Sequence, residues 1–116
     1  MNILEISEKD IISENTIKFL GLEIKLNNIK FEKTKHYVGI RPEHLKVNDK
    51  SDFTFNPEVE LIENLGNEKI VYIKKDKNQL SAKIPSNVEI LDKIGFNLKD
   101  LLIFDKNKIR IKPNTT

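Results

Sequence analysis

The chain has 116 residues, of which 20 are lysine or arginine and 18 aspartate or glutamate, giving a formal net charge of +2, and it has no cysteine. This length is enough for a core of its own, and we expect residues 1–116 to form a single domain. The lack of cysteine excludes disulfides, Cys-ligated zinc and thiol catalysis, and the mixed charge gives no steering toward nucleic acid or a membrane surface.

The apolar runs are too short to cross a membrane. The longest uninterrupted ones are residues 70–73 and 101–104, whereas a membrane helix needs about 20 apolar residues. Residues 1–5 have neither a basic region nor a continuous apolar stretch, so we expect no signal peptide. With the missing cysteines, this composition fits a cytosolic protein.

Residues 1–6 predict the first strand, and residues 7–15 a polar turn. Further on, Ile17 and Phe19 share one parity, whereas Leu22 and Ile24 share the other. A shift by one residue moves every side chain to the opposite face of a sheet. The sequence therefore predicts two strands joined by a tight turn or bulge at Leu20-Gly21, where glycine is suited.

Residues 27–36 predict a polar connection that leads into a short strand at residues 37–41. Pro42 ends this strand, because proline has no N–H for a ladder and pushes Arg41 into an extended conformation. A proline followed by Glu43 suits the first turn of a helix. We therefore expect residues 43–45 to form a helical turn.

After a loop at residues 47–52, a strand pattern resumes. Phe55, Val59 and Leu61 are predicted to point one way and the glutamates at 58 and 60 the other. Leu65-Gly66-Asn67 predicts a turn, and residues 75–78 a hairpin tip. Further strands are predicted at residues 68–74, 80–84, 94–98, 101–104 and 109–111, with a connection at 87–93.

These elements predict an all-β fold of about ten short strands, typical of a small barrel or sandwich. No amphipathic stretch is long enough for a substantial helix.

The segment Gly39-Ile40-Arg41-Pro42-Glu43-His44-Leu45 resembles the signature of the C-terminal regulatory domain, the TOBE domain, in ATP-binding subunits of bacterial ATP-binding-cassette (ABC) importers for maltose, other sugars and glycerol phosphate. Residues 59–66 and 70–72 resemble the strand, Leu-Gly turn and returning strand of that family, and Phe104-Asp105 resembles its closing segment. One departure is the short Lys99-Asp100 connection, where the family has a longer loop; any contact made by that loop is in doubt.

The resemblance implies a small oligonucleotide-binding (OB)-like barrel with additional strands, of the TOBE/MOP type. It implies a regulatory domain that catalyses nothing and whose partners are the ATP-binding core, a second copy of the subunit and a cytosolic regulator. The location implied is cytoplasmic, peripheral to the inner membrane and in contact with it only through the transporter. Gly39, Arg41, Pro42, Glu43 and His44 are the candidate interaction residues; Ile62 and Phe53 are further candidates for such a contact.

The ATPase core of that family needs a Gly-rich loop that ends in Gly-Lys-Ser or Gly-Lys-Thr. The glycines at 21, 39, 66 and 95 are isolated, and none precedes a lysine. We therefore expect no ATP or other cofactor on this chain, no catalytic residue and no enzymatic activity.

The two histidines, His36 and His44, lack the spacing of a metal site, and we expect no bound metal. A structural role is favoured for His44. Arg41 and Glu43 allow two readings. Either they form a surface pair that recognises a neighbouring subunit or regulator, or, as we favour, the Arg41 guanidinium is an internal clamp on a carboxylate or carbonyl. A buried clamp predicts that Arg41→Ala costs about 3 kcal/mol.

Two other functions are weighed from single segments. The basic run at residues 74–77, with Tyr72 nearby, permits a nucleic-acid patch, although a solvated hairpin tip is favoured and we expect no nucleic-acid partner. The alternative function is a free-standing barrel that binds a small oxyanion such as molybdate. It rests on Ser81-Ala82-Lys83-Ile84, which only superficially resembles the Ser-Ala-Arg-Asn type segment of such barrels.

Overall fold

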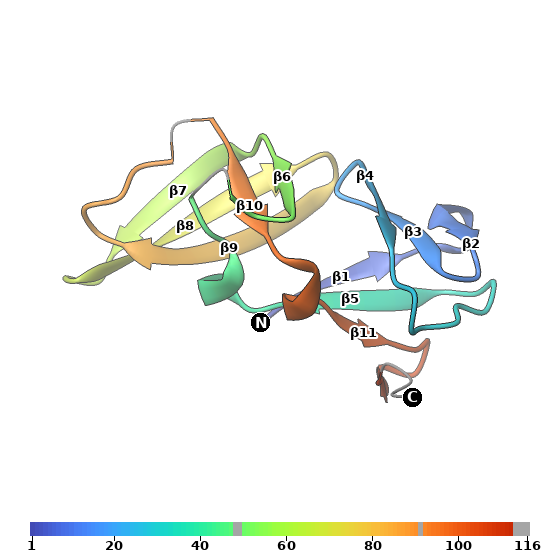
Figure 1. The fold of residues 1–116 in the computed structure, drawn as a ribbon. Coiled ribbons are helices and arrows are strands. Elements are labelled where there is room, and N and C mark those ends of the chain that lie inside the picture. The colour runs from blue at the N-terminus through green and yellow to red at the C-terminus, as the bar shows by residue number, and fades with distance from the viewer. Residues whose placement is uncertain (48–49, 91, 113–116) are drawn as a thin grey trace. The chain divides into compact units, whose positions relative to one another are not determined.

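The computed structural model describes residues 1–47, 50–90 and 92–112 (Figure 1). These residues form twelve β-strands and three single-turn 3-10 helices. The predicted all-β class is confirmed, with two strands more than the ten expected. Among the described residues, no helix is long and apolar enough to cross a membrane.

The chain divides into two compact units. Unit 1 contains Met1–Asn2 and Ile40–Leu101, and unit 2 contains Ile3–Gly39 and the chain from Leu102 onward. The single domain expected over residues 1–116 stays a prediction.

The larger sheet of unit 2 has the order β1-β5-β11-β12. Its antiparallel pairs set Val38 opposite Ile103, and Ile103 opposite Ile111. Val38 and Ile103 are buried, so the period-2 alternation of short apolar strands places one row inside. The four strands are β1 (Asn2–Ile6), β5 (His36–Ile40), β11 (Leu102–Phe104) and β12 (Arg110–Ile111).

A three-stranded meander makes the other sheet of unit 2. Leu20 and Gly21 both have positive φ, 53° and 77°, and Phe19 lies opposite Leu22. This confirms the predicted turn between two strands, since both central residues are left-handed as in a type I′ hairpin. The strands are β2 (Ile11–Ser13), β3 (Thr16–Phe19) and β4 (Leu22–Lys25).

One segment of unit 2 differs from the sequence prediction, and a second, the polar connection, agrees with it up to the start of β5 at His36. Residues 7–15, expected to be a polar turn, contain the 3-10 helix η1 (Glu8–Asp10) followed by β2, because Ile11 pairs with Ile17 across the sheet. The polar connection at residues 27–36 buries Ile29 and Phe31, which are 7% and 4% exposed. Burial of these apolar side chains stabilises a loop that has no ladder of its own.

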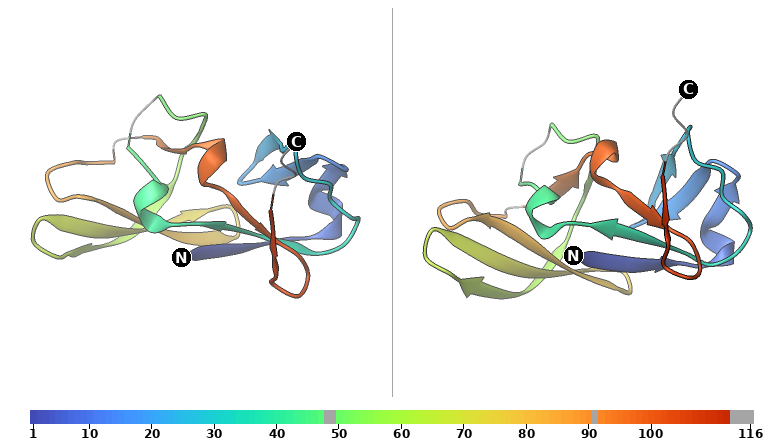
Figure 2. Two further views of the ribbon diagram at one scale, coloured as in Figure 1. Left: turned by 60° about the horizontal axis from the view of Figure 1, so that its bottom comes forward. Right: turned by 90° about the horizontal axis from the view of Figure 1, so that it is seen from below.

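Unit 1 contains a twisted antiparallel meander in the order β7-β8-β9 and a short pair, β6 and β10 (Figures 1 and 2). The meander buries alternate residues of β8 and β9, including Val71, Ile73 and Leu80. Its tip is the predicted hairpin, in which Asp76 has a φ of 56°. The strands are β6 (Phe53–Phe55), β7 (Glu58–Asn64), β8 (Glu68–Lys75), β9 (Asn78–Pro85) and β10 (Ile94–Phe96).

The predicted common face for Val59 and Leu61 is wrong. The register shifts between them, so that Val59 lies opposite Ile73 whereas Leu61 lies opposite Tyr72. Glu60 is the extra residue of a β-bulge, and one inserted residue turns the following side chains to the other face.

Leu98 was expected to continue the β10 strand, but it begins the 3-10 helix η3 (Leu98–Asp100). The Asp52 carboxylate accepts a hydrogen bond from the Leu98 N–H at 2.9 Å, and the Asn97 side chain accepts one from the Asp52 N–H at 3.0 Å. The carboxylate thereby satisfies one of the N–H groups that the start of a helix leaves unpaired. A residue far away in the sequence thus decides this turn.

Candidate functional site

The Arg-Pro-Glu-His segment, residues 41–44, follows β5 directly. Arg41 has extended backbone angles (φ −73°, ψ 142°), and its carbonyl accepts a hydrogen bond from the His44 N–H at 2.9 Å. Pro42 begins the 3-10 helix η2 (Pro42–His44). The predicted end of the strand and the helical turn after it are both confirmed.

Buried residues flank this segment. Gly39 is buried and lies opposite Leu102 in the β5–β11 ladder, while Ile40 and Leu45 are fully buried. Gly39 therefore has a position inside the sheet rather than on the surface. The side chains that remain accessible to a partner are those of Arg41 and Glu43, with Pro42 and His44 half-buried.

The internal clamp is not supported. Arg41 is exposed, and it forms no ion pair with any carboxylate among the described residues. The pKa of Glu43 is lowered by its own backbone N–H and by the charges of His44, Arg41 and Lys83. The segment therefore presents two charged groups to solvent, the Arg41 guanidinium and a Glu43 carboxylate that stays ionised. Arg41 and Glu43 are therefore both accessible at the surface, and their recognition of a neighbouring subunit or regulator stays a prediction.

His44 faces a carboxylate within unit 1. Its Nδ1 lies 3.7 Å from Asp100 Oδ1, a side chain only 13% exposed. This Nδ1 is buried and has no hydrogen-bond partner among the described residues. At 3.7 Å the contact is an ion pair only when the imidazole is protonated.

His36 has an ordinary structural environment in unit 2. It is 3% exposed, its Nδ1 lies 2.8 Å from the Thr34 carbonyl, and its ring meets Phe31 edge-on at 5.3 Å. Among residues 1–47, 50–90 and 92–112 no cluster of His, Asp and Glu is suited to a metal ion.

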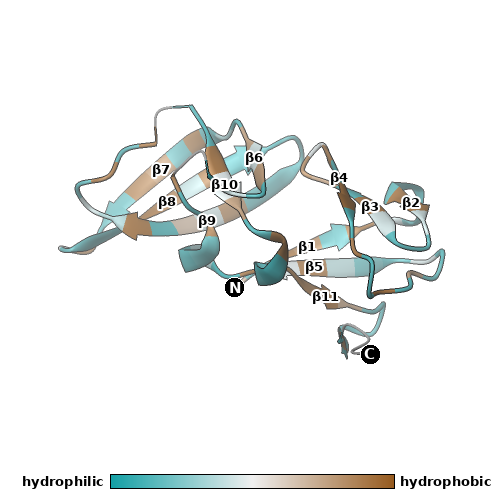
Figure 3. Cartoon of the chain, in the orientation of Figure 1, coloured by the Kyte–Doolittle hydropathy of each residue, from teal (hydrophilic) through white to brown (hydrophobic). Residues whose placement is uncertain are grey.

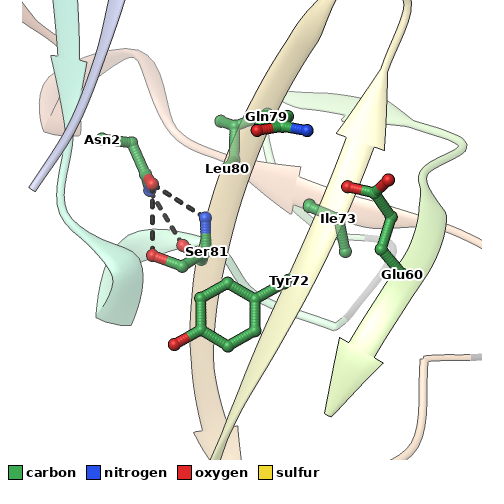
Figure 4. A pocket seen from close by; sticks show the side chains of 7 residues that line it. All are labelled: Asn2, Glu60, Tyr72, Ile73, Gln79, Leu80 and Ser81. Carbon is green, nitrogen blue, oxygen red and sulfur yellow. Dashed lines mark hydrogen bonds between the residues drawn. The ribbon is translucent and has the colours of Figure 1, made fainter. Parts of the chain in front are cut away.

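A shallow depression of about 270 Å³ lies over the meander of unit 1 (Figure 4). The Asn2 amide closes one end, because Nδ2 donates to the Ser81 carbonyl and Oδ1 accepts from the Ser81 N–H, both at 2.8 Å. The lining residues are Asn2, Glu60, Tyr72, Ile73, Gln79, Leu80 and Ser81.

The charge of this depression is negative. Glu60 contributes a carboxylate, and the Tyr72 hydroxyl donates to the nearby Glu63 carboxylate at 3.3 Å. The Glu63 charge, with some burial and this hydrogen bond, raises the pKa of Tyr72 above 10.0. A carboxylate beside an aromatic ring suits a cation better than an anion.

In the segment proposed for oxyanion binding, the donors of Ser81 are already engaged and Lys83 faces a carboxylate. Both the N–H and the hydroxyl of Ser81 point to Asn2 Oδ1, and Ala82 is buried. Lys83 Nζ lies 3.6 Å from a Glu68 carboxylate oxygen. These residues therefore do not converge on a vacant anion site.

The sequence did not predict the depression, because its lining residues become neighbours only through the pairing register of the strands. Only Asn2 left a signal, since it shares parity with buried Leu4 and Ile6 and is therefore a polar residue in an inward position. A buried amide in such a position needs partners.

The TOBE domain family matches residues 38–91. This match contains the Arg-Pro-Glu-His segment and strands β6 to β9, and the all-β architecture is consistent with a small OB-like domain of this type. No curated protein matches the chain.

Proposed function

We propose, starting from the TOBE domain match at residues 38–91, that this chain is a regulatory or accessory domain of the ATP-binding subunit of an ABC importer for sugars or glycerol phosphate. It holds subunits together or binds a regulator, in the cytoplasm at the inner membrane, and it catalyses no reaction. The ATP-binding core and a second copy of the subunit are its partners.

One observation carries this proposal: the matched residues contain the exposed Arg41 and Glu43 on a turn that buried neighbours hold in place. TOBE domains are typically regulatory or accessory domains. A short turn held by buried neighbours is a partly preorganised contact, because its backbone needs little further ordering on binding.

The test uses the full chain and the dimeric nucleotide-binding core of a sugar importer that lacks its own regulatory domain. Association is measured by analytical ultracentrifugation, and the effect on turnover by phosphate release. We expect binding and a changed ATPase rate, both weakened by the charge reversals Arg41→Glu and Glu43→Lys. No association with cores of sugar and glycerol-phosphate importers, at tens of micromolar protein, would refute the proposal.

A further inference from the structure

β7 is the edge of the unit 1 meander. Within the described residues it pairs with β8 alone, and all seven of its residues are exposed. An edge strand directs alternate backbone N–H and C=O groups away from its sheet, where another extended chain can pair with them. Such addition of a strand is a common mode of peptide recognition.

One face of this edge is apolar. Val59 and Ile62 lie opposite Ile73 and Val71, which are buried. Val59 and Ile62 therefore extend the buried face of the meander, yet they are 42% and 50% exposed. Apolar side chains from an added strand would remove this surface from water.

The other face of the edge is acidic. Glu58, opposite Lys74, and Glu63 lie on it with the exposed Leu61 between them. Glu60, at the bulge, lines the depression together with Tyr72 (Figure 4). The segment from Phe55 to Glu68 has four glutamates and neither lysine nor arginine, although the whole chain has 20 basic residues. In Figure 3, hydrophobic and hydrophilic bands accordingly follow one another along β7.

We propose that the β7 edge binds an extended segment of a partner protein in which apolar residues alternate with lysine or arginine. This inference rests on the proposed function, because it names the chemistry of a partner for the same domain. Side chains of an added strand alternate between the two faces. The apolar set covers Val59 and Ile62, the basic set meets the glutamates, and one basic side chain enters the depression between Glu60 and the Tyr72 ring.

A second copy of β7 is a poor occupant. Every charged residue of β7 is a glutamate, so self-pairing brings like charges together on one sheet face. Natural edge strands avoid association with their own copies by such charges. The same charges attract a basic strand, which gives selectivity through repulsion of one partner and attraction of another.

The test measures fluorescence anisotropy of a labelled eight-residue peptide of alternating lysine and valine, titrated with the full chain. The control peptide has the same composition with its four lysines grouped at one end. We expect the alternating peptide to bind about tenfold more tightly, with affinity that falls as salt rises. Hydrogen exchange should show new protection of β7 amides in the complex.

Two matched variants locate the contact. Ile62→Lys changes an exposed residue of β7, and Ile12→Lys changes a residue of β2 with the same 50% exposure. We expect Ile62→Lys to weaken binding about tenfold and Ile12→Lys to leave it unchanged. Glu60→Gln, which removes a charge from the depression, should also weaken binding.

Equal affinity for both peptides, binding without protection of β7, or equal loss in the two lysine variants would overturn the proposal. So would a dimer at neutral pH whose β7 amides are protected. The peptide assay contains no importer core, so a negative result in it rejects only the β7 proposal and leaves the proposed function intact. A failure of the chain to bind importer cores rejects the proposed function, and peptide binding at β7 is then still decided by the anisotropy measurement.

Discussion

The side-chain amide of Asn2 pairs with the backbone of Ser81 as a neighbouring strand would. Nδ2 donates to the Ser81 carbonyl and Oδ1 accepts from the Ser81 N–H, each at 2.8 Å, across 79 positions of sequence. Asn2 is 8% exposed, so these bonds replace water at groups that have lost access to it. One side chain thereby fixes the start of the chain to β9.

Removing this amide should destabilise the protein measurably. In Asn2→Ala the N–H and C=O of Ser81 lose their partners in a largely buried place, and we expect a loss of about 2 kcal/mol in the free energy of unfolding. Urea denaturation measures it. Ile3→Ala, at an adjacent residue that is 49% exposed, is the control and should change little. A loss no larger than that of the control would show that water replaces the amide.

Arg41→Ala should leave stability almost unchanged. The side chain is exposed and no carboxylate among the described residues pairs with it, so the expected change is within about 0.5 kcal/mol. Binding to the importer core should nevertheless weaken. Thermal unfolding and ultracentrifugation report the two quantities separately, and a loss near the 3 kcal/mol that a buried clamp implies would restore that reading.

Gly95→Ala should disturb the β6–β10 pair. A Cβ at this position would lie 2.6 Å from Cβ and Oγ of Ser51 and 3.0 Å from the Phe53 carbonyl oxygen. Relief requires movement of the backbone next to the stacked rings of Phe53 and Phe96, and overpacking of this kind costs about 1–3 kcal/mol.

Gly66→Ala is the matched comparison for Gly95→Ala, because a Cβ at Gly66 meets nothing within 4 Å and only the φ of 95° opposes it. Its cost should come from the backbone alone, about 1 kcal/mol. Equal stability of Gly95→Ala and the wild-type protein in denaturant titration would mean that the pair tolerates a side chain.

The ionisation of Tyr72 should depend on Glu63. The Glu63 carboxylate raises the pKa of Tyr72 above 10.0, so Glu63→Gln should return it toward that value. Because the folded pKa is raised, the contribution to stability is complete below pH 10.0 and is lost as pH rises through the folded value. Absorbance titration in a Tyr37→Phe background, where Tyr72 is the remaining tyrosine, measures the shift.

Neither oxyanions nor nucleotide should stabilise the chain. For molybdate, tungstate and sulfate, the Ser81 donors are already bonded to Asn2, and Lys83 is paired with Glu68. No Gly-Lys pair is available to hold the phosphates of Mg-ATP. Thermal shift and calorimetric titration should therefore show no binding at millimolar ligand, and a saturable rise in melting temperature with molybdate would favour the alternative function.

Local chemistry made several features predictable from sequence. The Leu20-Gly21 turn follows from the freedom of glycine to adopt positive φ. The end of β5 at Pro42 and the helical turn after it follow from the restricted backbone of proline. The Arg-Pro-Glu-His segment was recognisable from the order of its residue types, which includes a proline and a histidine.

Tertiary structure alone decided the rest. The bulge at Glu60, the helical turn that Asp52 stabilises at Leu98 and the pairing of Asn2 with Ser81 depend on partners far along the chain. Periodicity assigns a residue to a face only while the register is unbroken, and register is set by cross-strand pairing. The sequence by itself therefore determined the all-β class and the turns, whereas long-range pairing determined which side chains became the acidic edge and the depression.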